Sequence, residues 1–163
     1  MKRIVIAVLV VVLAFGVAVL AQPAAQKPGA KNWTPEQQGA LDALNKYVEA
    51  SLKGNVEEIM TFFRPDFIAR DFEQKLTTNY LALRKMNEEF YKAYKLSKYA
   101  VDPLEVQVEN NIAVLHLDFE ETFSDATGKE TNTYGPWAVI MVNQNNRWVF
   151  LSFCWVEKIR EGK

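Results

Sequence analysis

The hydrophobic period of the chain changes at Pro103, and this change restricts the fold more than any other feature of the sequence. Before it, apolar residues such as Leu41, Leu44 and Val48 recur at the spacing of an amphipathic helix. After it, residues 104–109 alternate apolar and polar side chains, which is the period of a strand with one buried face. Helices followed by long alternating strands predict an α+β domain in which helices cover one face of an antiparallel sheet.

Start and stop signals divide the first part of the domain into three helices. Thr34 precedes a proline and stands three residues before a glutamine, an arrangement typical of a helix start, and Gly54 ends this helix. The second helix begins at the next residue and stops at Pro65. We expect the third helix to begin near Thr77 or Thr78.

The second part predicts a meander of long strands joined by tight turns. Asparagine, aspartate and glycine clusters at 110–111, 125–128 and 144–146 mark the turns. The strands that they separate cover residues 104–109, 112–123, 130–142 and 147–157.

The N-terminal segment reads as an export signal. Lys2 and Arg3 precede an unbroken apolar run, and Ala21 follows it at a position suited to signal peptidase. We therefore expect residues 1–21 to be a signal peptide, 22–33 a flexible linker and 34–163 one domain, exported to the periplasm or secreted and free of the membrane after cleavage. The alternative is an uncleaved anchor, because the run is close to the shortest that spans a bilayer, about 17 residues.

Charge and cysteine content exclude several classes of protein. The formal net charge is −1, from 19 basic and 20 acidic residues spread along the chain, so no basic patch predicts nucleic-acid binding. Cys154 is the only cysteine, which rules out an internal disulfide. His116, Asp118 and Glu120 share one face of a strand, but same-face neighbours stand about 6.5 Å apart, too far for three to converge on one metal ion.

Two stretches of the sequence carry a resemblance to a known family. The first runs from Tyr47 through Gly54 to Asp66-Phe67 and Asp71, and the second is the final strand "NNRWVFLSFCW". Both resemble the nuclear transport factor 2-like superfamily, in particular its SnoaL-like and ketosteroid isomerase-like branches. The resemblance covers about residues 34–157. It implies a cystatin-like fold, in which three N-terminal helices pack on a strongly curved antiparallel sheet to form a cone-shaped roll around a deep pocket. It also implies no cofactor and a homodimer through the outer sheet face, which here carries Ile112, Val114 and His116.

The resemblance places Asp71 where ketosteroid isomerase-like members keep a general base and Tyr47 where they keep a hydrogen-bond donor. The second acid of such sites is replaced here by Ala138. Phe67 and Ala69 alternate with their neighbours along a short strand after Pro65, so we expect Asp71 to share their inward face at the pocket mouth. The alternatives are a core aromatic for Tyr47 and a cap or turn residue for Asp71.

The pocket itself is expected to be apolar and aromatic, which favours a small hydrophobic ligand. Ser152 and Cys154 are assigned to the face that carries Trp148 and Phe150, although Cys154 fits equally well as a small buried hydrophobe. The candidate pocket residues are Phe63, Tyr134, Ala138, Trp148, Ser152 and Cys154.

Two functions remain open from the sequence. The chain is either an exported binding or assembly module without catalysis, or a cofactor-independent isomerase, dehydratase or hydrolase that uses Asp71 and Tyr47.

Overall fold

The structure is a computed structural model that describes residues 31–160. Its contacts divide the chain into one unit up to Asn32 and a second unit from Trp33 to the end. The predicted signal peptide and nearly all of the predicted linker lie outside the described residues. The elements of the second unit are α1 (Pro35–Lys53), α2 (Val56–Met60), β1 (Phe63–Asp71), β2 (Leu76–Asn79), α3 (Tyr80–Ala93), β3 (Tyr94–Glu109), β4 (Ile112–Asp125), β5 (Glu130–Gln144), β6 (Arg147–Trp155) and β7 (Lys158–Arg160).

The first helix begins and ends as its sequence predicts. The backbone N–H of Gln37 donates to Thr34 Oγ1 over 3.3 Å, and the backbone N–H of Thr34 donates to Gln37 Oε1 over 2.8 Å. This reciprocal pair satisfies two amide groups that the first helical turn leaves free. At the other end Gly54 adopts φ 68°, a left-handed conformation in which a side chain would be strained.

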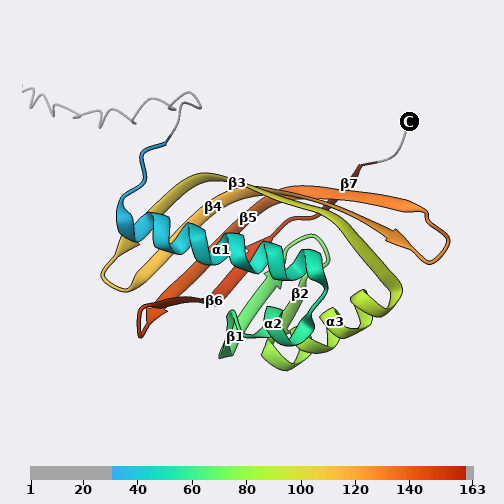
Figure 1. Cartoon of the computed structure of the whole chain (residues 1–163), viewed down its shortest axis with the longest axis horizontal. Coiled ribbons are helices and arrows are strands. Elements are labelled where there is room, and N and C mark those ends of the chain that lie inside the picture. Colours follow the sequence, from blue (N-terminus) through green and yellow to red (C-terminus); the bar gives the residue numbers. More distant parts are fainter. Residues whose placement is uncertain (1–30, 161–163) are drawn as a thin grey trace, which may run out of the picture. The chain divides into compact units, whose positions relative to one another are not determined.

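The seven strands form one curved mixed sheet in the order β2-β1-β6-β5-β4-β3, with β7 paired to β5 (Figure 1). Strands β3 to β6 make the predicted antiparallel meander. The predicted α+β fold with a curved sheet is confirmed, and within the described residues the one departure from antiparallel pairing is that β1 lies parallel to β6. Two parallel strands must be joined by a long connection, and the elements from β2 to β5, including α3, connect β1 to β6.

The third helix begins later than predicted. Thr77 and Thr78 belong to β2, where they pair with Arg70 and Ala69 of β1. The helix is capped instead by Asn79, whose Oδ1 accepts from the backbone N–H of Ala82 over 2.9 Å. β-branched residues such as threonine favour strands, which agrees with the place of Thr77 and Thr78 in β2. The hairpin of β1 and β2 thus separates α2 from α3.

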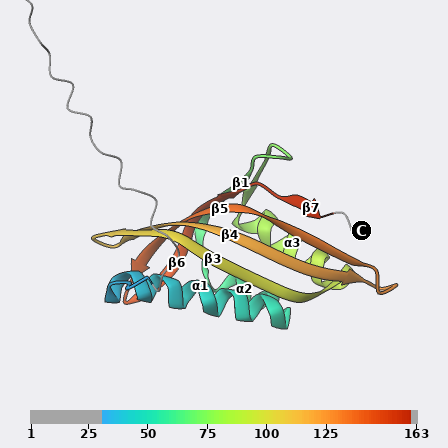
Figure 2. The same ribbon diagram turned by 90° about the horizontal axis from the view of Figure 1, so that it is seen from above.

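The hydrophobic core lies between α1 and the concave face of the sheet. Figure 2 shows α1 and α2 on one side of the strands. Leu44 of α1 is fully buried against the same core as Leu115 and Leu117 of β4 and Val139 of β5. Burial of each such side chain contributes about 2 kcal/mol. Among the described residues, no helix has the length and apolar character needed to cross a bilayer.

A bulge in β6 reverses the predicted faces of Ser152 and Cys154. Phe150 pairs with Met141 and Ser152 pairs with Ile140, so Leu151 is an extra residue in β6. Phe150 and Phe153 consequently both point inward. Ser152 and Cys154 point to the outer face, and their assignment to the face of Trp148 and Phe150 is wrong.

Candidate functional site

A cavity of about 140 Å³ lies on the inner side of the sheet beside α3. Met86 at its edge is 40% exposed, so the cavity reaches the surface there. Its walls come from seven elements and from the segment before β7, and they are mainly aromatic. The lining residues are Tyr47, Thr78, Leu83, Met86, Tyr99, Phe119, Glu121, Trp137, Phe153, Trp155 and Glu157.

Glu121 is a candidate functional residue that the sequence reasoning missed. On β4 the inward positions are Ala113, Leu115, Leu117 and Phe119, and the same alternation continues to Glu121. A carboxylate at the next inward position of an otherwise apolar row was the available signal. Glu121 pairs with Tyr99 on β3, which brings their side chains to the same face.

The environment of Glu121 disfavours its charge. Burial raises the pKa of the Glu121 carboxyl to about 7, and the nearby carboxylate of Glu157 contributes in the same direction. Hydrogen bonding with the Tyr99 hydroxyl opposes part of this rise. Glu121 is therefore a group that exchanges its proton near neutral pH, as an acid–base residue or a charge-sensing residue must.

Glu157 reaches the cavity because Gly135 allows a close backbone approach. A Cβ atom at Gly135 would stand 1.9 Å from the carbonyl oxygen of Val156, so no other residue fits without moving the chain. Burial, and then the charge of Asp71, raise the pKa of the Glu157 carboxyl, while hydrogen bonding with Trp155 opposes the rise.

Tyr47 and Tyr99 form the aromatic wall next to Glu121. The rings of Tyr47 and Tyr99 meet edge to face with centroids 6.1 Å apart, and Tyr99 stacks on Trp137 at 6.5 Å. Burial raises the pKa of both phenols, and the carboxylate of Glu121 adds to the effect. Both hydroxyls therefore stay protonated at physiological pH and serve as hydrogen-bond donors.

Asp71 lies on the inner side of β1 but is not among the residues that line the cavity. It is 2% exposed and shares a face with Phe67 and Ala69. Its Oδ1 accepts from the backbone N–H groups of Glu73 over 2.8 Å and Gln74 over 3.0 Å. These bonds close the turn between β1 and β2, which is an aspartate's usual part in a turn.

The other predicted pocket residues are distributed over three places. Phe63 and Trp148 are buried in the core, 6% and 7% exposed. Ala138 and Cys154 line an outer depression beside His116, and Ser152 faces the same side of the sheet. Of the eight predicted site residues, all within the described part of the chain, Tyr47 alone lines the cavity.

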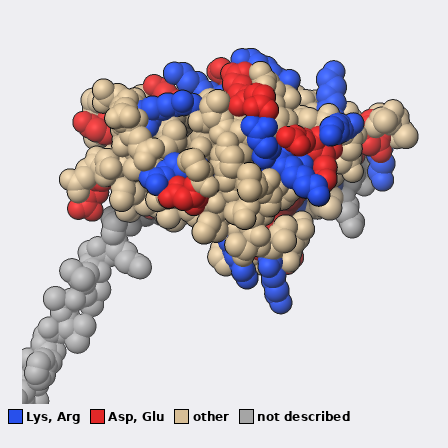
Figure 3. Space-filling model, turned by 90° about the horizontal axis from the view of Figure 1, so that it is seen from below, with Lys and Arg blue, Asp and Glu red and all other residues tan. Residues whose placement is uncertain are grey.

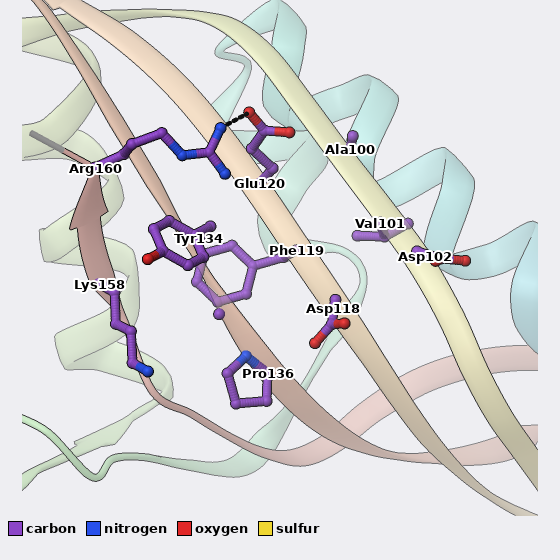
Figure 4. A pocket seen from close by; sticks show the side chains of 11 residues that line it. Ala100, Val101, Asp102, Asp118, Phe119, Glu120, Tyr134, Pro136, Lys158 and Arg160 are labelled. Carbon is purple, nitrogen blue, oxygen red and sulfur yellow. Dashed lines mark hydrogen bonds and ion pairs between the residues drawn. The ribbon is translucent and has the colours of Figure 1, made fainter. Parts of the chain in front are cut away.

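Tyr134 belongs to a larger depression of about 450 Å³ on the outer side of the sheet (Figure 4). There Arg160 lies 4.9 Å from the centre of the Tyr134 ring and pairs with Glu120 over 3.4 Å. Glu120 also pairs with Lys98 over 2.8 Å. Glu120 and Arg160 thus have charged partners within the protein. The carboxyls of Glu121 and Glu157 differ, because no Lys, Arg or His is among the described residues that line their cavity.

Neither the surface charge of the face in Figure 3 nor the arrangement of potential metal ligands within residues 31–160 indicates another binding site. Figure 3 shows Lys and Arg side chains intermixed with Asp and Glu on one face of the domain. Within residues 31–160, no group of three or more His, Cys, Asp or Glu side chains is arranged to hold a metal ion.

Comparisons with known proteins identify the fold. No family model matches the sequence, and no curated protein matches it. Among solved structures, a ketosteroid isomerase-like protein from Erwinia carotovora atroseptica SCRI1043 aligns with a TM-score of 0.65 and 15% identity, over 77% of this chain and 98% of that one. An NTF2-like protein from Cytophaga hutchinsonii aligns with a TM-score of 0.66 and 10% identity, over 77% and 100%.

The CaMKII hub of S. rosetta is also similar, with a TM-score of 0.61 and 17% identity over 78% of this chain and 100% of that one. The chain therefore has the nuclear transport factor 2-like fold that its sequence resembles. The names of these neighbours include a ketosteroid isomerase-like protein and a CaMKII hub, so the fold leaves the function to be argued from the site.

Proposed function

We propose that the protein is a binding module that encloses a small organic molecule in the cavity around Glu121. The observation that carries the proposal is a cavity of about 140 Å³ with six aromatic side chains in its lining. A dry apolar cavity of about 150 Å³ is large enough to bind benzene. The ligand is therefore small, and its surface is mainly apolar.

Blocking the mouth of the cavity tests this proposal. Leu83 of α3 lines the cavity, whereas Leu81 on the same helix is 74% exposed. We expect benzene to shift the amide resonances of cavity residues in the protein, and Leu83→Trp to abolish these shifts. The matched variant Leu81→Trp should bind as the wild type does. Equal binding by both variants, or no shifts in the wild type, would contradict the proposal.

A second candidate function is cofactor-independent proton transfer, and the pKa of about 7 at Glu121 favours it. Glu121 is a better candidate for the general base than Asp71. The carboxylate of Asp71 accepts hydrogen bonds from two backbone amides, and Asp71 is not among the residues that line the cavity. The hydroxyls of Tyr47 and Tyr99 would donate to a developing oxyanion.

Deuterium exchange tests the catalytic candidate. An enzyme of this kind should accelerate the exchange of acetone protons in D₂O, and Glu121→Gln should abolish the acceleration. Asp71→Asn should retain it. Exchange at the rate of buffer alone would leave the binding module as the better account.

We also propose a homodimer through the outer face of the sheet. Ile68 of β1, Ile112 of β4 and Ile140 of β5 are 54%, 44% and 36% exposed on this face. The same patch on two copies can be self-complementary about a two-fold axis. Light scattering should show a dimer at micromolar concentration, and Ile140→Lys should shift it to monomer. A wild-type monomer would refute the dimer.

Export is proposed from the N-terminal sequence. The charged start, the apolar run and Ala21 support cleavage at that residue. Protein recovered from the producing cell should begin near Gln22, whereas intact Met1 in the membrane fraction would refute cleavage.

A further inference from the structure

The cavity around Glu121 has a one-sided charge. Its lining contains the carboxyls of Glu121 and Glu157, and no Lys, Arg or His is among the described residues that line it. The basic residues closest in sequence to Glu157 are Lys158 and Arg160, and both line the depression around Tyr134 on the outer side of the sheet. Arg160 points there toward Glu120 (Figure 4).

We propose that the ligand of this cavity is a small organic cation, a methylated ammonium group held between aromatic rings and the two carboxylates. This inference rests on the binding function proposed above and adds the charge of the ligand. An anionic ligand would face two carboxylates without a compensating cation, which disfavours phosphates and carboxylic acids.

The aromatic walls suit a cation with an apolar surface. Trp137 and Tyr99 lie nearly parallel, with centroids 6.5 Å apart, and Tyr47 stands tilted against Trp137 at 6.2 Å. Phe153 packs edge-on against both Trp137, at 5.4 Å, and Trp155, at 5.3 Å. Rings at several angles around one space form the kind of cage in which quaternary ammonium groups bind through the electron-rich ring faces.

A bound cation would favour the ionised form of both carboxyls. Burial raises the pKa of both carboxyls, and a neighbouring carboxylate adds to each rise, that of Glu157 for Glu121 and that of Asp71 for Glu157. The other titratable groups that face Glu121 are the phenols of Tyr47, Tyr91 and Tyr99, all neutral at physiological pH because burial raises the pKa of each. A bound ammonium would stabilise the carboxylate of Glu121 and release its proton.

Tetramethylammonium and tert-butanol, its neutral counterpart of similar size, provide the test. We expect the protein at pH 8 to bind tetramethylammonium at least ten-fold more tightly than tert-butanol in an NMR titration. The affinity for the cation should fall as the pH is lowered through 7, and the affinity for tert-butanol should not change. Glu121→Gln keeps the shape of the side chain and should weaken cation binding at least ten-fold, which removes the preference for tetramethylammonium over tert-butanol.

The outcomes separate this inference from the proposed function. Equal affinities for the two probes, or a cation affinity unchanged in Glu121→Gln, would overturn the cationic ligand while leaving a cavity that binds small molecules. Binding of neither these probes nor benzene would overturn the proposed function itself. Should Glu121→Gln fail to fold, Glu157→Gln provides the second variant, with the same loss of cation affinity expected.

Discussion

Asp71 and Glu121 are two carboxylates on the inner side of one sheet, and their surroundings differ in kind. Asp71 accepts hydrogen bonds from two backbone amides over 2.8 and 3.0 Å and closes the turn after β1. Glu121 faces a cavity, with Tyr99 as its hydrogen-bonding neighbour and Glu157 as a repelling one. The carboxylate of Asp71 is fixed by hydrogen bonds to the backbone. The pKa of the Glu121 carboxyl is raised, so its ionised form is disfavoured.

The surroundings of the two groups separate a carboxylate that stabilises local structure from one that is available to a ligand. A carboxylate whose acceptor capacity is used by nearby amides stabilises local structure and has little left for a ligand. A carboxyl that is buried beside another acid lowers the free energy of unfolding at neutral pH. Proteins keep such a group where it takes part in binding or catalysis. Asp71 fits the first description and Glu121 the second.

The largest effect that we expect is a dependence of the free energy of unfolding on pH, which Glu121 causes and Glu121→Gln should remove. The pKa of Glu121 is raised in the folded state to about 7 from 4.5. The folded protein thus keeps a proton that the unfolded chain loses, and stability falls as the pH rises from 4.5 through 7. The loss reaches up to about 3 kcal/mol above pH 7.

Urea unfolding at pH 5 and pH 8 measures this dependence. The wild type should lose most of that free energy of unfolding between the two values, and Glu121→Gln should lose much less. Asp71→Asn is the matched control and should follow the wild type closely. A wild-type stability that is the same at both pH values would contradict the assignment of Glu121.

A smaller effect is expected from Asp71→Ala. The substitution removes the acceptor of the Glu73 and Gln74 amides and should lower the free energy of unfolding by about 1–2 kcal/mol. Asp71→Asn keeps a side-chain oxygen at the same place and should lose less. Binding of benzene should persist in both variants. A loss of binding in stably folded Asp71→Asn would show that the turn and the cavity are not separate in function.

The smallest effect tests the electrostatic link between the two regions. The charge of Asp71 contributes to the raised pKa of Glu157. Asp71→Asn removes that charge, so the pKa of Glu157 should move down toward its ordinary value. Carbon-13 NMR of the glutamate carboxyls measures the change, and an unchanged titration of Glu157 would show that the two carboxyls do not interact.

Local signals in the sequence were sufficient for much of the fold. The cap at Thr34, the stop at Gly54 and the alternation along residues 104–109, β4 and β5 depend on neighbours in the chain, and these features formed as predicted. β3 itself begins at Tyr94, ten residues before the predicted start. The parallel pairing of β1 with β6 joins segments more than eighty residues apart, as Ile68 with Ser152, and no local pattern specifies it.

The site was harder to predict for two physical reasons. The bulge at Leu151 adds one residue to β6, and one residue is enough to exchange the faces of Ser152 and Cys154. Glu121 was within reach, since it continues the inward row of β4, but a charged side chain at the end of that row breaks the apolar pattern on which the interpretation relied.

The central claim is that Glu121 titrates in a cavity that binds a cation, and the carbon-13 titration of its carboxyl group tests both parts in one measurement. In the free protein the midpoint should lie at about pH 7. Saturating tetramethylammonium should lower it by about one pH unit, which corresponds to the ten-fold preference for the ionised form. A midpoint near 4.5 in the free protein, or one that the cation leaves unchanged, would contradict the claim.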